Sequence, residues 1–319
     1  MKSFLLKLSF IIIALAGVYG FLVNRLSQDF VDIYYEKFTQ KAGGLIIGIS
    51  KANKGINPEI IEQKLQALNY YDTPLINYAL NVNNSPFGEV YLESIKKKIK
   101  PIKNRQLFIV SVSPGAFSTP LKMKSEDIYK MDKNHTILGK VNKVDTKPNY
   151  NYIINTYELP LYNALHPYDK WLFYELHPNG WLEIRPNTEI DSIKATDIAF
   201  WKAGILKEFE AQLGIQQISS YRIESFIKIL EFFKTRGDVF IVRIPQDEEF
   251  NILEHKLWPS FEQKMDSIAK QYNVPFLNYS NLANKFKTYD GLHFDTNGAT
   301  QFTEMLSEDI YVILKNKEN

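Results

Sequence analysis

One serine, one aspartate and one histidine have the types and spacing needed for nucleophilic catalysis. Ser50 directly follows the apolar run 44–49, whereas Asp290 and His293 stand three positions apart near the C-terminus. A serine hydroxyl needs a base to take its proton, and a histidine base needs a carboxylate to fix its tautomer. We therefore expect Ser50 to be the nucleophile, His293 the base and Asp290 the orienting carboxylate. Alternatively, Ser50 caps a turn, Asp290 caps its own loop and His293 packs on a helix.

The elements that must position these residues follow a βαβαβ order. Continuous apolar runs of strand length predict strands buried on both faces. We expect strands at 44–49, 74–78, 106–112, 238–244 and 275–277, and helical periodicity at 58–68, 86–100, 190–234, 254–272 and 297–315. This order predicts an α/β fold, a flavodoxin-like three-layer α/β/α sandwich around a parallel sheet. Ligands bind beyond the carboxyl ends of such strands, which is where Ser50 stands.

Between residues 114 and 189 the alternation stops, and the chain becomes rich in Asn, Pro, Tyr and Lys. The segment is too long for an ordinary loop. We expect an inserted subdomain or lid that lies over the active edge. The α/β domain then comprises residues 43–113 and 190–319.

These motifs resemble those of the SGNH/GDSL hydrolase superfamily, over residues 43–312. Within it, the chain is similar to a membrane-anchored bacterial branch that includes the D-alanyl transfer protein of teichoic acids and alginate O-acetylation proteins. The resemblance depends mainly on the Asp290/His293 pair, which is followed by residues 294–299 and a C-terminal helix. At Ser50 the sequence Gly-Ile-Ser-Lys-Ala replaces the family's familiar Gly-Asp-Ser-Leu form. The resemblance implies the same catalytic roles for these three residues.

The oxyanion donors depart from the family pattern. That pattern takes donors from the serine N–H, a glycine after the second strand and an asparagine after the third. Here residues 77–86 contain no glycine, so Asn81 or its neighbour Asn83 is expected to serve, and Ser113 stands in the third block. Because one lost donor costs about 10²–10³ in rate, acyl transfer, slow turnover and lost activity all stay open.

Other polar and aromatic residues have weaker patterns. Arg243 ends the fourth expected strand, where it would contact an anionic substrate or form a plain salt bridge. Three aromatic residues of the insertion could stack on sugar rings or form its small core: Trp171, Tyr174 and Trp181. Three histidines of the insertion lack metal-ligand spacing, so we expect no metal site and no cofactor: His135, His166 and His177.

The N-terminus predicts export. Residues 1–25 carry Lys2 and Lys7 before an apolar run and Arg25 after it, which places the N-terminus inside and the rest outside. Ala14-Leu15-Ala16 matches a cleavage pattern, but the run continues to Val23, so we favour an uncleaved signal-anchor over a signal peptide or a buried core helix. Residues 26–42 are expected to form a juxtamembrane spacer helix.

Composition limits the remaining functions. Lys and Arg total 38 against 36 Asp and Glu, a net charge of +2, which is too balanced for electrostatic binding of nucleic acid. The absence of cysteine excludes thiol nucleophiles and disulfides. We expect a serine acyl-ester hydrolase or O-acyltransferase outside the cytoplasmic membrane, acting on an acylated polysaccharide or other cell-envelope polymer. The resemblance adds a membrane-bound O-acyltransferase as partner. The alternative is a non-catalytic assembly or glycan-binding protein on the same fold.

Overall fold

A five-stranded parallel sheet forms the centre of the computed structural model, which describes residues 1–68, 71–84, 86–166 and 171–318. The strands occur in the order β2-β1-β3-β8-β9, which is the flavodoxin-like order. Their bounds are β1 Gly44–Ile47, β2 Leu75–Asn77, β3 Gln106–Ser111, β8 Gly237–Arg243 and β9 Phe276–Asn278. The chain changes direction across the sheet between β1 and β3, so the segments that follow these two strands meet at its carboxyl edge.

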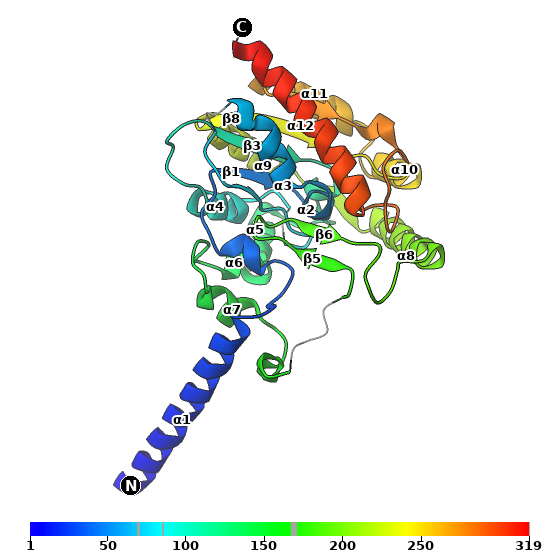
Figure 1. Cartoon of the computed structure of the whole chain (residues 1–319). Coiled ribbons are helices and arrows are strands. Elements are labelled where there is room, and N and C mark those ends of the chain that lie inside the picture. The colour runs from blue at the N-terminus through cyan, green and yellow to red at the C-terminus, as the bar shows by residue number, and fades with distance from the viewer. Residues whose placement is uncertain (69–70, 85, 167–170, 319) are drawn as a thin grey trace.

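Helices cover both faces of this sheet (Figure 1). On one face lie α2 Ser50–Gly55, α3 Pro58–Leu65 and α12 Thr296–Glu318; on the other lie α4 Glu89–Lys98, α9 Ser220–Lys234 and α11 Phe261–Tyr272. Side chains alternate between two cores because successive strand residues point to opposite faces. Leu45 and Ile47 belong to one core and Ile46 to the other. The predicted three-layer α/β/α sandwich is confirmed.

The insertion extends beyond its predicted C-terminal boundary. The strand β4 Ser118–Pro120 pairs antiparallel with β7 Gln216–Ile218, so the inserted segment closes near residue 218 rather than 189. It contains α5 Ser125–His135, α6 Ile137–Lys140, α7 Tyr150–Thr156, η4 Leu161–Ala164, the hairpin β5 Tyr174–Leu176 with β6 Leu182–Ile184, and α8 Ala195–Leu213. Helical periodicity alone could not show that residues 216–218 pair with a strand almost 100 positions earlier.

Two long helical predictions are each divided in the structure. The 254–272 segment belongs to α10 Glu248–Leu257 and α11, with Pro259 between them. Proline lacks the N–H that a continuous helix needs, which accounts for the break. The 190–234 segment is divided into α8 and α9 by β7, after Gly214.

The N-terminal helix α1 Lys2–Leu26 projects from the domain (Figure 1). Its length and apolar composition are sufficient to cross a membrane. The spacer helix expected at 26–42 is absent: the region has only the 3₁₀ turn η1 Tyr35–Phe38. Tyr35 and Phe38 are buried in the core, so this region is part of the domain instead of a spacer.

Candidate active site

The first component is Ser50, the first residue of α2, which begins immediately beyond β1. Gly48 makes this tight strand-to-helix turn possible, because its φ of +149° lies where side chains are strongly disfavoured. A Cβ at Gly48 would also lie 2.8 Å from the Cβ of Ser111, at the end of β3. The close approach of the two strand ends thus places the Ser50 hydroxyl at the carboxyl edge of the sheet.

The second component is the loop before α12, which carries Asp290 and His293. Oδ1 of Asp290 accepts hydrogen bonds from the backbone N–H groups of Leu292, at 3.0 Å, and His293, at 2.7 Å. Oδ2 of the same carboxylate lies 2.7 Å from Nδ1 of His293. The carboxylate therefore fixes both the loop backbone and the orientation of the imidazole ring.

The two components meet although they are 243 positions apart. Nε2 of His293 lies 2.8 Å from Oγ of Ser50. An ionised carboxylate can only accept, so Nδ1 carries the hydrogen that points to Asp290 and Nε2 is left as an acceptor for the Ser50 hydroxyl. This is the hydrogen-bond order of a Ser-His-Asp triad, with all three sequence-predicted residues in contact.

The protonation states suit this arrangement. Burial opposes ionisation of Asp290, but His293 and Lys54 outweigh burial and lower the pKa of Asp290 to about 2. Burial lowers the pKa of His293 below its ordinary 6.5; Asp290 opposes that shift, and Lys54 and Lys51 add to it. At neutral pH the carboxylate is charged and the imidazole is neutral, which is the state a general base requires.

A cavity of about 220 Å³ opens at Ser50 and His293. Ser113, which follows β3, lines it and is 1% exposed, and its Oγ has no hydrogen-bond partner among the residues the structure describes. An unpaired buried hydroxyl is costly, and this one is available to a bound group. Apolar side chains form much of the remaining lining: Ile49, Val82, Ile205, Phe209, Leu213, Leu253, Leu257 and Leu292.

The two other predicted oxyanion residues do not line this cavity. The Asn81 side-chain oxygen accepts a hydrogen bond of 2.8 Å from Asn84, and Asn83 is exposed. Between them, Val82 lines the cavity. Of the three residues, the structure thus brings only Ser113 beside Ser50.

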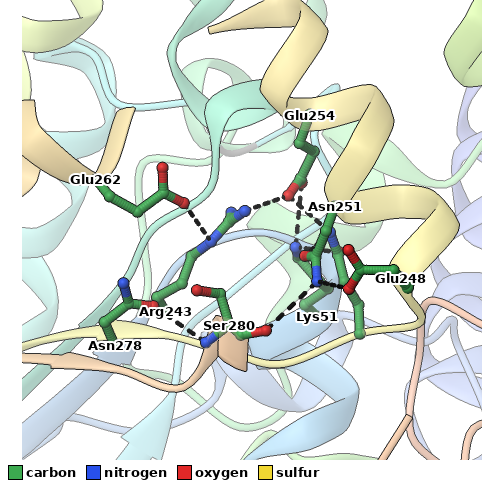
Figure 2. A network of polar contacts seen from close by, with 9 residues as sticks. Lys51, Arg243, Glu248, Asn251, Glu254, Glu262, Asn278 and Ser280 are labelled. Atoms are coloured by element: carbon green, nitrogen blue, oxygen red, sulfur yellow. Dashed lines mark hydrogen bonds and ion pairs between the residues drawn. The ribbon is translucent and has the colours of Figure 1, made fainter. Parts of the chain in front are cut away.

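Arg243 also lies away from the cavity, in a buried polar network (Figure 2). Its Nη2 is 2.6 Å from Oε2 of Glu254, and its guanidinium stacks over the ring of Phe261. The expectation that Arg243 binds substrate is replaced by the salt bridge that the sequence left open. Its position as the last residue of β8 suits either function, and only the location of Glu254 distinguishes them.

Lys51 connects that network to the nucleophile. Its Nζ lies 2.6 Å from Oε1 of Gln246 and 3.2 Å from Oε1 of Glu254, and Lys51 itself lines the cavity. Burial lowers the pKa of Lys51 to about 8, although Glu254 opposes the shift. This contact was not predicted because Glu254 is 203 positions away; the local signal was a lysine directly after the serine that follows a buried strand.

The cavity is covered by a later segment than the one predicted. Helix α8, outside the expected 114–189 lid, supplies Ile205 and Phe209 to the lining, and only Gly115 and Ser118 come from the expected range. No residue of α8 is buried. Lys202 holds the helix to the start of α10, at 2.8 Å from Asp247.

The aromatic residues of the insertion occupy two different places. Trp171 packs edge-on against Tyr174 and Trp201 and at a tilt against Tyr289, and these four rings line a second cavity of about 450 Å³. Trp181 is buried in the core, and its Nε1 donates a hydrogen bond of 2.8 Å to the backbone oxygen of Lys54. Trp181 is therefore a packing residue that supports α2.

The three histidines considered as metal ligands are not brought together. Nε2 of His177 lies 2.7 Å from Oε2 of Glu183, whereas His135 and His166 are exposed. Within the described ranges, no group of three or more His, Asp or Glu side chains is placed to hold a metal ion.

No protein-family profile and no curated protein matches this sequence. Among solved structures, the chain is similar to the inhibitor-bound form of an aryl esterase from M. smegmatis, with a TM-score of 0.36 and 11% identity over 84% of this chain and 99% of that chain. The functional assignment therefore depends on the geometry around Ser50.

Proposed function

We propose that the chain is a serine acyl-ester hydrolase or O-acyltransferase. The single observation that supports this most strongly is the hydrogen-bonded series from Ser50 through His293 to Asp290, with distances of 2.8 and 2.7 Å. Ser50 comes from the first turn of α2, and Asp290 and His293 come from the loop before α12; these two segments meet at the carboxyl edge of the sheet. Ser113, unpaired in the same cavity, supplies a further polar group.

In the proposed reaction, Oγ of Ser50 attacks the acyl carbonyl carbon while Nε2 of His293 takes the hydroxyl proton. The resulting oxyanion is held by the backbone N–H of Ser50, in the first turn of α2, and by the hydroxyl of Ser113. The intermediate collapses as the leaving alkoxide takes the proton from Nε2, which leaves the acyl group on Ser50. Water or an acceptor hydroxyl then attacks this ester, with the proton passing through His293 back to Oγ of Ser50.

We further propose that transfer to a cell-envelope polysaccharide is faster than hydrolysis. The cavity is small and mostly apolar, and α8 covers it, so water is restricted near the acylated serine. The oxyanion site also lacks the usual asparagine, so a small soluble ester gains little transition-state binding. Contacts with remote parts of a polymer would compensate for that loss.

The location proposed for this activity is the outer side of the cytoplasmic membrane, with α1 as an uncleaved anchor. Lys2 and Lys7 before the apolar run support this orientation. A membrane-delivered acyl donor, supplied by an O-acyltransferase partner, would reach a tethered enzyme at raised effective concentration. Protease added to intact spheroplasts should digest the domain; digestion only after lysis would contradict the orientation.

The experiment that tests the reaction compares two fates of one acyl group. The full chain in detergent is given p-nitrophenyl acetate with and without envelope polysaccharide, and p-nitrophenolate, free acetate and polymer-bound acetyl are measured. We expect slow release of free acetate and Ser50-dependent acetyl on the polymer. Rapid hydrolysis that Ser50→Ala abolishes, with no acetyl on the polymer, would indicate a general esterase instead.

A further inference from the structure

An apolar surface lies beside the point where α1 leaves the domain. Its members are exposed residues of α7 and of the segment that follows it, which we call the anchor-side patch: Tyr150, Ile154, Leu159, Tyr162 and Leu165. Their exposed fractions range from 41% for Tyr150 to 60% for Tyr162. Exposed apolar groups gathered in this way mark an interaction surface, whereas single ones are ordinary.

Sequence spacing places the members of each element on one face. Ile154 is four positions after Tyr150 on α7, and residues at that spacing share a helix face. Leu165, which directly follows η4, is three positions after Tyr162, and residues three apart in a 3₁₀ turn are eclipsed. Between 150 and 165 the only charged residue is Glu158, so the surface also lacks the charge that normally keeps a water-facing helix soluble.

The patch is continuous with the anchor helix. Val23 and Leu26, in the last turns of α1, are buried, and the partly buried residues around their core include Tyr157 and Leu161. The Tyr150 hydroxyl also donates a hydrogen bond of 2.6 Å to Oδ1 of Asn24. The surface therefore begins where the free part of α1 ends, and Figure 1 shows α7 beside that end.

The length of α1 fixes the depth of this surface. Residues 4–21 are exposed along the helix, and 18 residues of helix span about 27 Å. The hydrocarbon core of a bilayer is about 30 Å thick, so the whole free length is needed to cross it. Leu22 is partly buried and Val23 is buried, so no linker lies between the exposed part of α1 and the domain. If α1 spans the membrane, the patch is held at the lipid–water interface.

We propose that the anchor-side patch inserts into the interface of the bilayer and fixes the domain against the membrane. This inference depends on the anchor role of α1 given under the proposed function. Tyrosine suits this depth because its ring is apolar and its hydroxyl is polar, and Tyr150 and Tyr162 supply two such rings. The anchor-side patch is thus expected to contact the lipid surface, and binding to a protein partner is the competing outcome of the test.

The absence of cysteine allows a direct test with single-cysteine variants of the full chain. Each carries an environment-sensitive NBD label in phosphatidylcholine–phosphatidylglycerol vesicles, with nitroxide lipids that quench at shallow or deep positions. Ile154→Cys and Leu165→Cys report the patch, and Ile13→Cys reports α1. Val312→Cys is the matched control, because Val312 is 45% exposed and lies on α12, far from α1 in Figure 1.

We expect labels at positions 154 and 165 to shift to shorter wavelength and to lose most fluorescence with the shallow nitroxide. The label at 13 should respond most to the deep nitroxide, and the label at 312 to neither. A response at 13 alone would contradict the insertion of the patch into the membrane but would support α1 as an anchor. No response at 13 overturns the anchor and this inference together. A wavelength shift at 154 and 165 in native membranes, without quenching by nitroxide lipids in vesicles, would show that the patch binds a protein. That result would contradict the proposal that it inserts into the lipid interface.

Discussion

Nζ of Lys54 lies 2.7 Å from the phenol oxygen of Tyr289, whose ring is stacked on the imidazole of His293. An ammonium group is thereby held beside the triad on the same helix as Ser50. Burial lowers the pKa of Lys54 to about 8, and Asp290 opposes the shift. Below pH 8 the charge is present, and it disfavours a second positive charge on His293.

The pH dependence of Ser50 acylation should reflect this charge. A base with a lowered pKa stays unprotonated at lower pH, so the rate of acylation should be constant at neutral pH and fall only below pH 6.5. Lys54→Met removes a positive charge, raises the pKa of His293 and should move the acid limb to higher pH. The measurement is the rate of fluorophosphonate labelling from pH 4 to pH 9.

The matched control for that change is Lys264→Met, on the exposed surface of α11. It removes the same charge from a side chain that does not line the cavity and should leave the acid limb in place. An equal displacement in both variants would mean that net charge, and not the contact beside Tyr289, sets the pKa.

Asp290→Asn tests the orienting carboxylate. The amide keeps the size of the side chain but can donate to Nδ1, which favours the imidazole tautomer that cannot accept from Ser50. We expect the acylation rate to fall by about 10⁴-fold. Intact-protein mass spectrometry of the fluorophosphonate adduct measures it, and circular dichroism checks folding. A loss of less than tenfold would argue that His293 does not need this carboxylate.

Ser113→Ala tests the proposed oxyanion donor. Because this hydroxyl has no partner among the described residues, its removal should not lower the melting temperature, but it should reduce acylation by about 10²–10³-fold. Thr119→Val is the matched control: it removes another buried and likewise unpartnered hydroxyl, which does not line the cavity. Equal rates in both variants and the unmodified chain would remove Ser113 from the mechanism.

A buried ion pair joins the insertion to the α/β domain, and it predicts a stability effect. Nη2 of Arg222, on α9, lies 2.8 Å from Oδ1 of Asp132, on α5, and both side chains are at most 4% exposed. Arg222→Met leaves a buried carboxylate unpaired, so we expect a loss of about 3–5 kcal/mol in the free energy of unfolding. Urea denaturation measures the loss.

The second half of that test is the double variant Arg222→Met, Asp132→Leu. Removing both charges also removes the unpaired carboxylate, so most of the lost stability should return. A double variant as unstable as the single one would show that packing, and not charge, is the main contribution of Arg222.

The features that could be predicted from the sequence depend on local patterns along the chain. Strands such as β1 and β3 were predictable because a parallel strand buried on both faces leaves a continuous apolar run. Ser50, Asp290 and His293 were predictable because each follows or precedes an element that ends at the same sheet edge. Their contact needs no information beyond that topology.

The features that were not predicted depend on partners distant in sequence. The antiparallel pairing of β4 with β7 extends the insertion so that it includes α8, which covers the cavity. The sequence of residues 190–213 predicted a helix but not this position. Arg243 and Lys51 both contact Glu254, which appeared in the sequence as one charge of a polar helix. Ser113 lines the cavity beside Ser50, as its position after the third strand predicted, whereas Asn81 does not, because the loop at 81–84 presents Val82 instead.

The most direct test of the central claim is the mass of the full chain after reaction with a fluorophosphonate at pH 7. An isolated serine does not react, whereas a serine hydrogen-bonded to a neutral histidine does. We expect one adduct per chain, located by peptide mapping at Ser50 and absent from Ser50→Ala and His293→Gln. A folded chain that gains no adduct, or one that gains it elsewhere, would contradict the proposed catalysis and favour a binding protein on the same fold.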